Sequence, residues 1–378
     1  MTSPPLRARR VHIAGSCGPT APREQLEAVH RIVCRTTALM LDAGATFVSA
    51  IGPEPRRYDG VSTVFYWDCL EEVARWASEH RDEAHDRAPV AKVIATERAV
   101  ATIPQDRAGL WQDLLASNVI AFESLPPGWR SAALVRIRQA RYGNLMIAIS
   151  GAVGTRHLAE LYGERGNPVV PLPFDLGSSR GEDAPGAFAL SREARADATR
   201  FFVLADGDAT AALLALSPTL EADAFAGRLV DLASRLAPPR AFCIRLMNPT
   251  TEDFTQVEGF FRSVVEPVLE DLGYSTFDLT TDKPASMFVN VEIFSKLHRC
   301  ALAVCDFTGL RNNVFMEGGY ALGHALPTVL TARHGVELPF DADALATHRW
   351  SPDDHPDDAR KRFGDDVRAA LVRRPLID

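Results

Sequence analysis

The chain has 378 residues, of which 46% are hydrophobic and 24% charged, so it is long enough for two domains that each bury a core. Its formal net charge of −8 and isoelectric point near 5.7 argue against nucleic-acid binding as the main activity, because neutralising phosphates needs a basic surface. No apolar segment follows the basic N-terminus, and none reaches the length of a membrane span. We therefore expect a cytoplasmic protein with no membrane partner.

The six cysteines are scattered through the chain without C-x-x-C spacing. Most lie within apolar runs, so we expect small buried hydrophobic residues rather than a disulfide framework. No His/Cys cluster has the spacing of a zinc site, and we predict no metal.

The N-terminal half alternates apolar strands with amphipathic helices. Strands are predicted at residues 10–15, 46–51, 89–96, 118–122 and 145–149. Helices are predicted between them at residues 23–42, 65–79, 108–117 and 131–141. This strict alternation is typical of a doubly wound parallel sheet with helices on both faces.

Glycine-containing loops follow the first and the last of these strands. A loop of this kind before a helix offers backbone N–H groups to a phosphate, and both loops lie at the same edge of the predicted sheet. We therefore predict a site for a small nucleotide ligand. The residues expected to form it are Gly15, Ser16, Cys17, Gly151, Val153, Gly154 and Thr155. The alternative is that the glycines only permit tight turns between strand and helix.

Together with the run at 166–172, these loops resemble the SLOG superfamily over residues 9–180. That superfamily includes Lonely Guy phosphoribohydrolases, the DNA-processing protein DprA, and nucleotide sensors attached to defence effectors. Lonely Guy enzymes typically carry P-G-G-x-G-T-x-x-E, and this chain has Leu158 at the position of the glutamate. The resemblance therefore implies ligand binding rather than hydrolysis for this half.

A polar stretch at 177–186 precedes helices near 191–200 and 222–236, which we expect to pack on the first domain. Their apolar faces could instead form an oligomer contact. Pro238-Pro239 cannot continue a helix and marks a boundary. We predict a nucleotide-binding domain at 9–238, a catalytic domain at 240–350, and a charged C-terminal helix at 351–378.

The C-terminal half repeats the alternation of strand and helix. Strands are predicted at 241–247, 274–279 and 301–305, with helices at 257–272 and 288–298. The predicted fold class is therefore α/β, with two doubly wound parallel-sheet (Rossmann-like) domains.

Asp306, Asn313 and Glu317 follow the strand at 301–305. Ligands of parallel sheets bind beyond the carboxyl ends of the strands, so we expect these side chains to converge on one crevice. Apolar residues precede Glu317 and two glycines follow it, which favours a desolvated carboxylate able to attack an anomeric carbon. The alternative is that Asp306 caps a loop, Asn313 supplies a turn, and Glu317 is favoured by the helix dipole.

The pattern D-x-T-G-x-x-x-N-V-x-x-E-x-G-Y-A-L-G at 306–323 resembles the nucleoside 2-deoxyribosyltransferase-like group. This group is related to TIR domains, several of which serve as effectors in bacterial antiviral defence, and the resemblance extends from about 240 to 350. It implies that Glu317 is catalytic and that Asp306 and Asn313 orient the sugar or the base. The substrate contacts that we expect are Met247, Asp278, Asp282, Gly309 and Gly318.

The sequence thus predicts a nucleotide-sensing effector that cleaves an N-ribosidic bond in antiviral defence. NAD⁺ is the first candidate substrate, and a nucleoside or nucleotide monophosphate is the second. We expect no cofactor and a homo-oligomeric state. The alternatives are a non-catalytic nucleotide-binding scaffold, and a Lonely Guy-type phosphoribohydrolase acting from the first domain.

Overall fold

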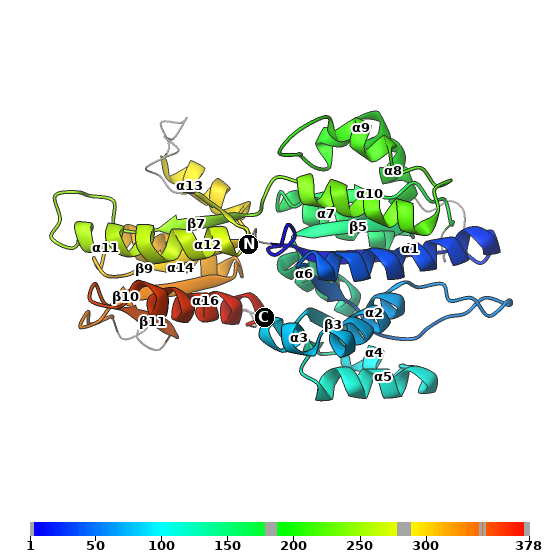
Figure 1. The fold of residues 1–378 in the computed structure, drawn as a ribbon, viewed down its shortest axis with the longest axis horizontal. Coiled ribbons are helices and arrows are strands. Elements are labelled where there is room, and N and C mark those ends of the chain that lie inside the picture. Colours follow the sequence, from blue (N-terminus) through cyan, green and yellow to red (C-terminus); the bar gives the residue numbers. More distant parts are fainter. Residues whose placement is uncertain (1–3, 178–186, 278–288, 340–341, 343–344, 374–378) are drawn as a thin grey trace. The chain divides into compact units, whose positions relative to one another are not determined.

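The computed structural model describes residues 4–177, 187–277, 289–339, 342 and 345–373. The chain divides into two compact units, an N-terminal unit ending at Ala237 and a C-terminal unit beginning at Pro238 (Figure 1). Each unit has one parallel sheet flanked by helices, so the predicted fold class is confirmed. Within the described residues, no helix is both long and apolar enough to cross a membrane.

The sheet of the N-terminal unit has the strand order β4-β3-β2-β1-β5-β6. Its strands are β1 (Arg10–Ser16), β2 (Thr46–Ser49), β3 (Ala91–Thr96), β4 (Ile120–Leu125), β5 (Leu145–Ser150) and β6 (Val169–Pro171). The first helices are α1 (Arg23–Asp42), α2 (Tyr66–Glu79), α3 (Arg81–Arg87), α4 (Glu97–Val100), α5 (Gln105–Ala116), α6 (Ser131–Tyr142) and α7 (Val153–Glu164). The chain adds β2 to β4 on one side of β1 and then β5 on the other, so the direction of winding switches between β1 and β5.

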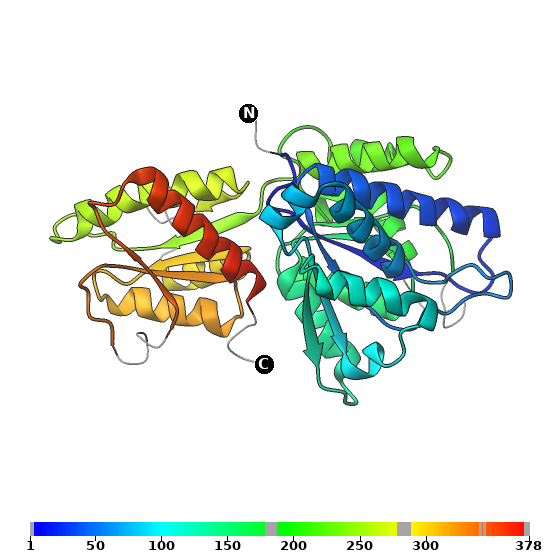
Figure 2. The ribbon, with the colours of Figure 1, turned by 60° about the horizontal axis from the view of Figure 1, so that its bottom comes forward.

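Both faces of this sheet are covered, and strand β5 shows why its sequence is apolar throughout. Leu145, Ile147 and Ile149 belong to a core that includes buried residues of α1, α2 and α10 (Ala222–Arg235). Met146 and Ala148 belong to a second core with residues of α6 and α7. Successive strand side chains point to opposite faces, so a strand buried on both faces has no polar alternation. Figure 2 shows helices on both sides of the sheet.

The helices after β6 also belong to the N-terminal unit. They are α8 (Ala187–Ala196), the short 3₁₀ helix η1 (Ala198–Arg200), α9 (Ala209–Leu214) and α10. Helix α10 packs along α1, and α8 packs against β5 and β6. Ala194 of α8, Leu213 of α9 and Phe225 of α10 are thus buried in the core of this unit.

The sheet of the C-terminal unit has the order β11-β10-β9-β7-β8, again entirely parallel. Its strands are β7 (Arg240–Ile244), β8 (Ser275–Phe277), β9 (Leu302–Asp306), β10 (Thr328–Arg333) and β11 (Thr347–Trp350). Its helices are α11 (Phe254–Phe260), the π-helical turn η2 (Phe261–Val265), α12 (Glu266–Asp271), α13 (Val289–His298), α14 (Asn312–Gly323) and α16 (Pro356–Val372). Strand β8 lies on one side of β7 and β9 on the other, so winding switches between β7 and β9.

The C-terminal helix is less solvated than its run of charges suggests. One face of α16 packs against β10, β11 and η2, with Phe363 and Val367 fully buried. The ring of Phe260 stacks on Trp350 at 4.5 Å, and Phe363 meets Phe260 edge to face at 6.1 Å. The aspartates in the first turn of α16 therefore belong to a helix that packs on one face of the sheet.

Gly15 is required by the pairing of β1 with β5. A Cβ atom at this position would lie 1.9 Å from the backbone oxygen of Ile149, whereas one at Gly227 in α10 would meet nothing within 4 Å. We predict that Gly15→Ala lowers the free energy of unfolding by more than about 3 kcal/mol. Gly227→Ala should raise it by about 0.5–1 kcal/mol, because alanine favours a helix. Urea unfolding of both variants measures this, and equal stabilities would contradict it.

Candidate functional site

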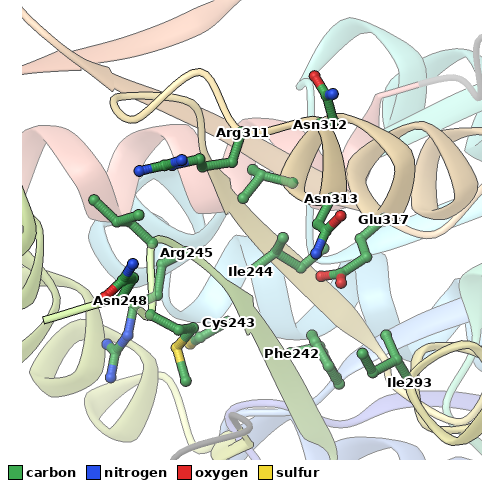
Figure 3. Close-up of a pocket in the computed structure, with 13 residues that line it drawn as sticks. Phe242, Cys243, Ile244, Arg245, Asn248, Ile293, Arg311, Asn312, Asn313 and Glu317 are labelled. Atoms are coloured by element: carbon green, nitrogen blue, oxygen red, sulfur yellow. The ribbon is translucent and has the colours of Figure 1, made fainter. Parts of the chain in front are cut away.

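A pocket of about 500 Å³ lies in the C-terminal unit beyond the carboxyl ends of β7 and β9 (Figure 3). Winding of the sheet switches between these two strands, so the loops that follow them diverge and leave a crevice. The residues that line it are Phe242, Cys243, Ile244, Arg245, Leu246, Met247, Asn248, Ile293, Arg311, Asn312, Asn313, Val314 and Glu317. We call this the Glu317 pocket.

The sequence of α14 carries Glu317 into the pocket. The buried positions of this helix are Val314, Glu317, Gly318 and Ala321, which fall on one face at helical spacing. Glu317 thus lies on the apolar stripe of the helix, and only 9% of its surface is exposed. Burial disfavours the charged form and raises the pKa of Glu317 from 4.5 to about 7. Both protonation states are therefore populated near neutral pH.

Asn313 lies one turn before Glu317 and lines the same pocket, and Figure 3 shows the two side chains next to each other. Met247 also lines the pocket, from the segment after β7. The structure thus brings together three of the residues singled out from the sequence.

Asp306 does not line the pocket. Its carboxylate is 1% exposed and turned into the fold, where Oδ1 accepts from the Thr308 amide at 3.0 Å. Oδ2 accepts from Thr331 Oγ1 at 2.7 Å and from the Trp350 indole at 2.8 Å. Burial raises the pKa of Asp306, and these donors act in the opposite direction. Asp306 therefore joins β9 to β10 and β11 and does not face a substrate in the pocket.

The two glycines expected to contact substrate are packing positions. A Cβ atom at Gly318 would lie 2.7 Å from Cys305 Sγ, so this glycine lets α14 approach β9 closely. One at Gly309 would lie 3.3 Å from Leu246 Cδ2. Neither glycine lines the pocket. The remaining two expected contacts, Asp278 and Asp282, lie outside the described residues.

Two arginines of the pocket were not singled out from the sequence. Arg245 is buried at the end of β7, where its guanidinium lies 2.9 Å from Glu266 and 3.3 Å from Glu258 and over the Phe261 ring. Arg311 is exposed and precedes α14. Arg245 could have been found in the sequence as a charged residue inside the apolar run 241–247. Arg311 lies within the pattern at 306–323 that resembles the deoxyribosyltransferase-like group.

A second cavity, of about 220 Å³, lies in the N-terminal unit where winding switches between β1 and β5. We call it the N-terminal cavity. Its lining is His12, Ile13, Ala14, Gly15, Ala50, Tyr66, Arg136, Gln139, Gly154, Thr155 and Leu158. Gly15, Gly154 and Thr155 of the predicted ligand site are among these residues. Ser16, Cys17, Gly151 and Val153 are not.

The other predicted loop residues have different surroundings. Cys17 is buried, which raises the pKa of its thiol to about 11 and leaves it protonated. Gly151 has a φ of +88°, and a Cβ atom there would lie 2.4 Å from Thr155 Oγ1. The positive φ angle and this close approach require glycine at position 151 for the turn alone. Val153 is 53% exposed at the start of α7.

The N-terminal cavity has basic and neutral polar side chains on its described lining. Its described lining contains no carboxylate, and it includes Leu158, the residue at the position of the glutamate in the Lonely Guy sequence motif. Arg136 Nε donates to His157 Nδ1 at 3.1 Å. Complete burial lowers the pKa of His12 to about 3, so its imidazole is neutral. Among the residues that the structure describes, no cluster of three His, Cys, Asp or Glu could hold a metal.

Each of the two Rossmann-like units thus has a pocket at its switch point, where parallel α/β proteins bind their ligands, and the buried Glu317 lines the pocket of the C-terminal unit. Residues 6–227 match a family model described as "ATP nucleosidase Cap17-like, N-terminal". The match covers more than half of the chain, which therefore belongs to this family. The family description indicates nucleosidase activity in general. No curated protein matches the chain.

The match ends before β7, so the Glu317 pocket lies outside it. The model describes the N-terminal part of its family's proteins and therefore corresponds to the N-terminal unit here. The resemblances to the SLOG superfamily and to the deoxyribosyltransferase-like group remain predictions.

The raised pKa of Glu317 makes its effect on stability depend on pH. The folded state holds this proton up to about pH 7 and the unfolded state only to about 4.5, so the contribution of Glu317 to stability falls as pH rises between these values. We predict that Glu317→Gln, which stays neutral, becomes more stable relative to wild type by about 3 kcal/mol between pH 4.5 and 8. Urea unfolding of both proteins across this range tests it. A stability difference that does not change with pH would show that the carboxyl group is solvated.

Proposed function

We propose that the C-terminal unit hydrolyses the N-glycosidic bond of a nucleotide, with Glu317 as the catalytic carboxylate. The observation that carries the proposal is the position of Glu317, buried on an apolar helix face yet lining a pocket at the switch point of a parallel sheet. The chain also belongs to a nucleosidase family, which supports the same chemistry, and this match rests on residues 6–227 rather than on the C-terminal unit.

The reaction breaks the bond between C1′ of the ribose and the base. The base leaves with the bonding electron pair, and positive charge develops on C1′ and the ring oxygen. Adenine takes up a proton as it leaves, whereas the pyridinium of NAD⁺ leaves directly as neutral nicotinamide. An ionised Glu317 in a poorly solvated pocket would stabilise this charge or form a transient ester with C1′. Water then adds to C1′ and loses a proton, and where an ester has formed its C1′–O bond breaks and the Glu317 carboxylate is released. Asn313, one turn away, would hydrogen-bond a sugar hydroxyl.

Two substrates share this bond and are the first to assay. The family description supports ATP. The resemblance to TIR-like enzymes supports NAD⁺, in which nicotinamide is a good leaving group. Both carry phosphates attached to the ribose whose glycosidic bond would be cleaved.

The N-terminal cavity is proposed to bind a phosphorylated nucleotide that controls this activity. Gly15, Gly154 and Thr155 line it beside the N-terminus of α7, whose first N–H groups suit an anion, and Arg136 contributes a positive charge. Such a sensor joined to a nucleotide-cleaving unit would suit an antiviral effector. A cytoplasmic location and a homo-oligomeric state belong to the same proposal.

Two alternatives differ in where base release occurs. A phosphoribohydrolase acting from the N-terminal unit would keep its activity when Glu317 is replaced, although the described lining of that cavity has no carboxylate to perform the reaction. A non-catalytic scaffold would bind nucleotides and release no base from any of them.

We predict that Glu317→Gln lowers base release by at least about 1,000-fold, because the charge opposing the oxocarbenium ion is lost. The wild-type rate should rise with pH up to about 7 and then level off, as the carboxylate becomes ionised. Chromatography of adenine and nicotinamide measures both. Glu270→Gln, an exposed glutamate of α12, is the matched control. Retention of more than a tenth of the activity, a change below about 1.4 kcal/mol, would exclude Glu317 as the catalyst.

We also predict that Gly154→Leu abolishes binding in the N-terminal cavity. A Cβ atom at Gly154 meets only Arg136, at 3.5 Å, so the fold accepts it while a longer side chain fills the cavity. Gly163→Leu, on the same helix but with open space around it, is the control. Calorimetry of the full chain with nucleotides and cyclic nucleotides compares the two. Equal affinities in both variants, or no ligand for the wild type, would refute the sensor proposal.

A further inference from the structure

The Glu317 pocket has two chemically different ends. Glu317 and Asn313 lie at one end, near the apolar side chains of Phe242 and Ile293 (Figure 3). Arg311 and Asn248 lie at the other end, and Figure 3 shows both well separated from the Glu317 carboxylate. One end therefore suits the sugar and an uncharged base, and the other suits an anion.

Of the two arginines in the pocket, Arg311 is the better placed to meet a ligand. The guanidinium of Arg245 already lies against the carboxylates of Glu258 and Glu266. Arg311 is exposed at the rim of the pocket and forms no ion pair with any residue that the structure describes. It also precedes α14, whose first N–H groups add positive potential at this end.

Asn248 presents a hydrogen-bond donor at the same end. Its Oδ1 accepts from the Thr250 amide at 3.1 Å and from Thr250 Oγ1 at 2.8 Å. These bonds occupy the carbonyl oxygen and fix the orientation of the side chain, which leaves the Nδ2 group as the donor toward a ligand. An arginine and an amide N–H group together match the oxygens of a phosphate.

We infer that Arg311 and Asn248 form a phosphate subsite that makes the pocket selective for nucleotides phosphorylated on the 5′-oxygen over nucleosides. The inference rests on the proposed function, since C1′ placed at Glu317 sets the direction of the rest of the substrate. The 5′-carbon and the base are attached on opposite sides of the ring oxygen. A ribose with C1′ at Glu317 can thus direct its 5′-phosphate toward Arg311 and away from a like-charged carboxylate.

The test compares wild type, Arg311→Ala and Arg311→Lys in kcat/KM for AMP, ATP and adenosine. The ratio of nucleotide to nucleoside kcat/KM should fall by about 30–100-fold in Arg311→Ala, mainly through KM, because a charge-assisted bidentate contact is lost. Arg311→Lys should recover part of the ratio. Arg299→Ala, an exposed arginine outside the pocket, should leave the ratio at the wild-type value.

A measurement of ATP binding tests the phosphate subsite independently of catalysis. Calorimetry of ATP with Glu317→Gln, alone and combined with Arg311→Ala, measures the subsite without turnover. Weaker ATP binding in the double variant than in Glu317→Gln supports the subsite, whether or not any of the proteins releases base. Absence of base release from the wild type would refute only the proposed function. Equal binding in the two variants, or an unchanged kcat/KM ratio, would overturn the subsite while leaving the catalytic role of Glu317 in place.

Discussion

The C-terminal unit depends on one buried carboxylate, that of Asp306. It accepts hydrogen bonds from Thr331 on β10 and Trp350 on β11, and from the amide of Thr308 in its own loop. Three strands and the loop leading to α14 are thus fixed to one group. A buried charge without such partners would be strongly destabilising, so the strands must keep this arrangement. The start of α14, and with it the position of Glu317, follows from that constraint.

Two carboxyl groups only eleven residues apart in sequence therefore have different environments. Asp306 is fully occupied by donors and serves the fold. Burial is the sole cause that raises the pKa of Glu317, which lines a pocket and can exchange a proton near neutral pH. A carboxyl group saturated with donors suits a structural role, whereas one that is desolvated in a pocket suits the catalytic role that we propose for Glu317. Keeping Glu317 desolvated costs stability above neutral pH, which is a common feature of functional sites.

The sequence was sufficient for features that depend on local pattern. Apolar strands alternating with helices predicted both parallel sheets, and the apolar residues before Glu317 together with the glycines after it predicted a desolvated carboxyl group. Features that depend on distant partners were not predictable in this way. The direction of the Asp306 side chain is set by Thr331 and Trp350, which lie 25 and 44 residues further along the chain. Strand β11 is short, and three of its four residues are polar, so it has little apolar signal.

We propose that water replaces the base at C1′ of a nucleotide in the Glu317 pocket. Incubating wild-type protein with ATP in ¹⁸O-labelled water, followed by mass spectrometry of the products, tests this most directly. We expect unlabelled adenine and a ribose triphosphate that has gained one ¹⁸O atom at C1′. Label found in inorganic phosphate or pyrophosphate, without free adenine, would show cleavage at the phosphates and would contradict the proposed reaction.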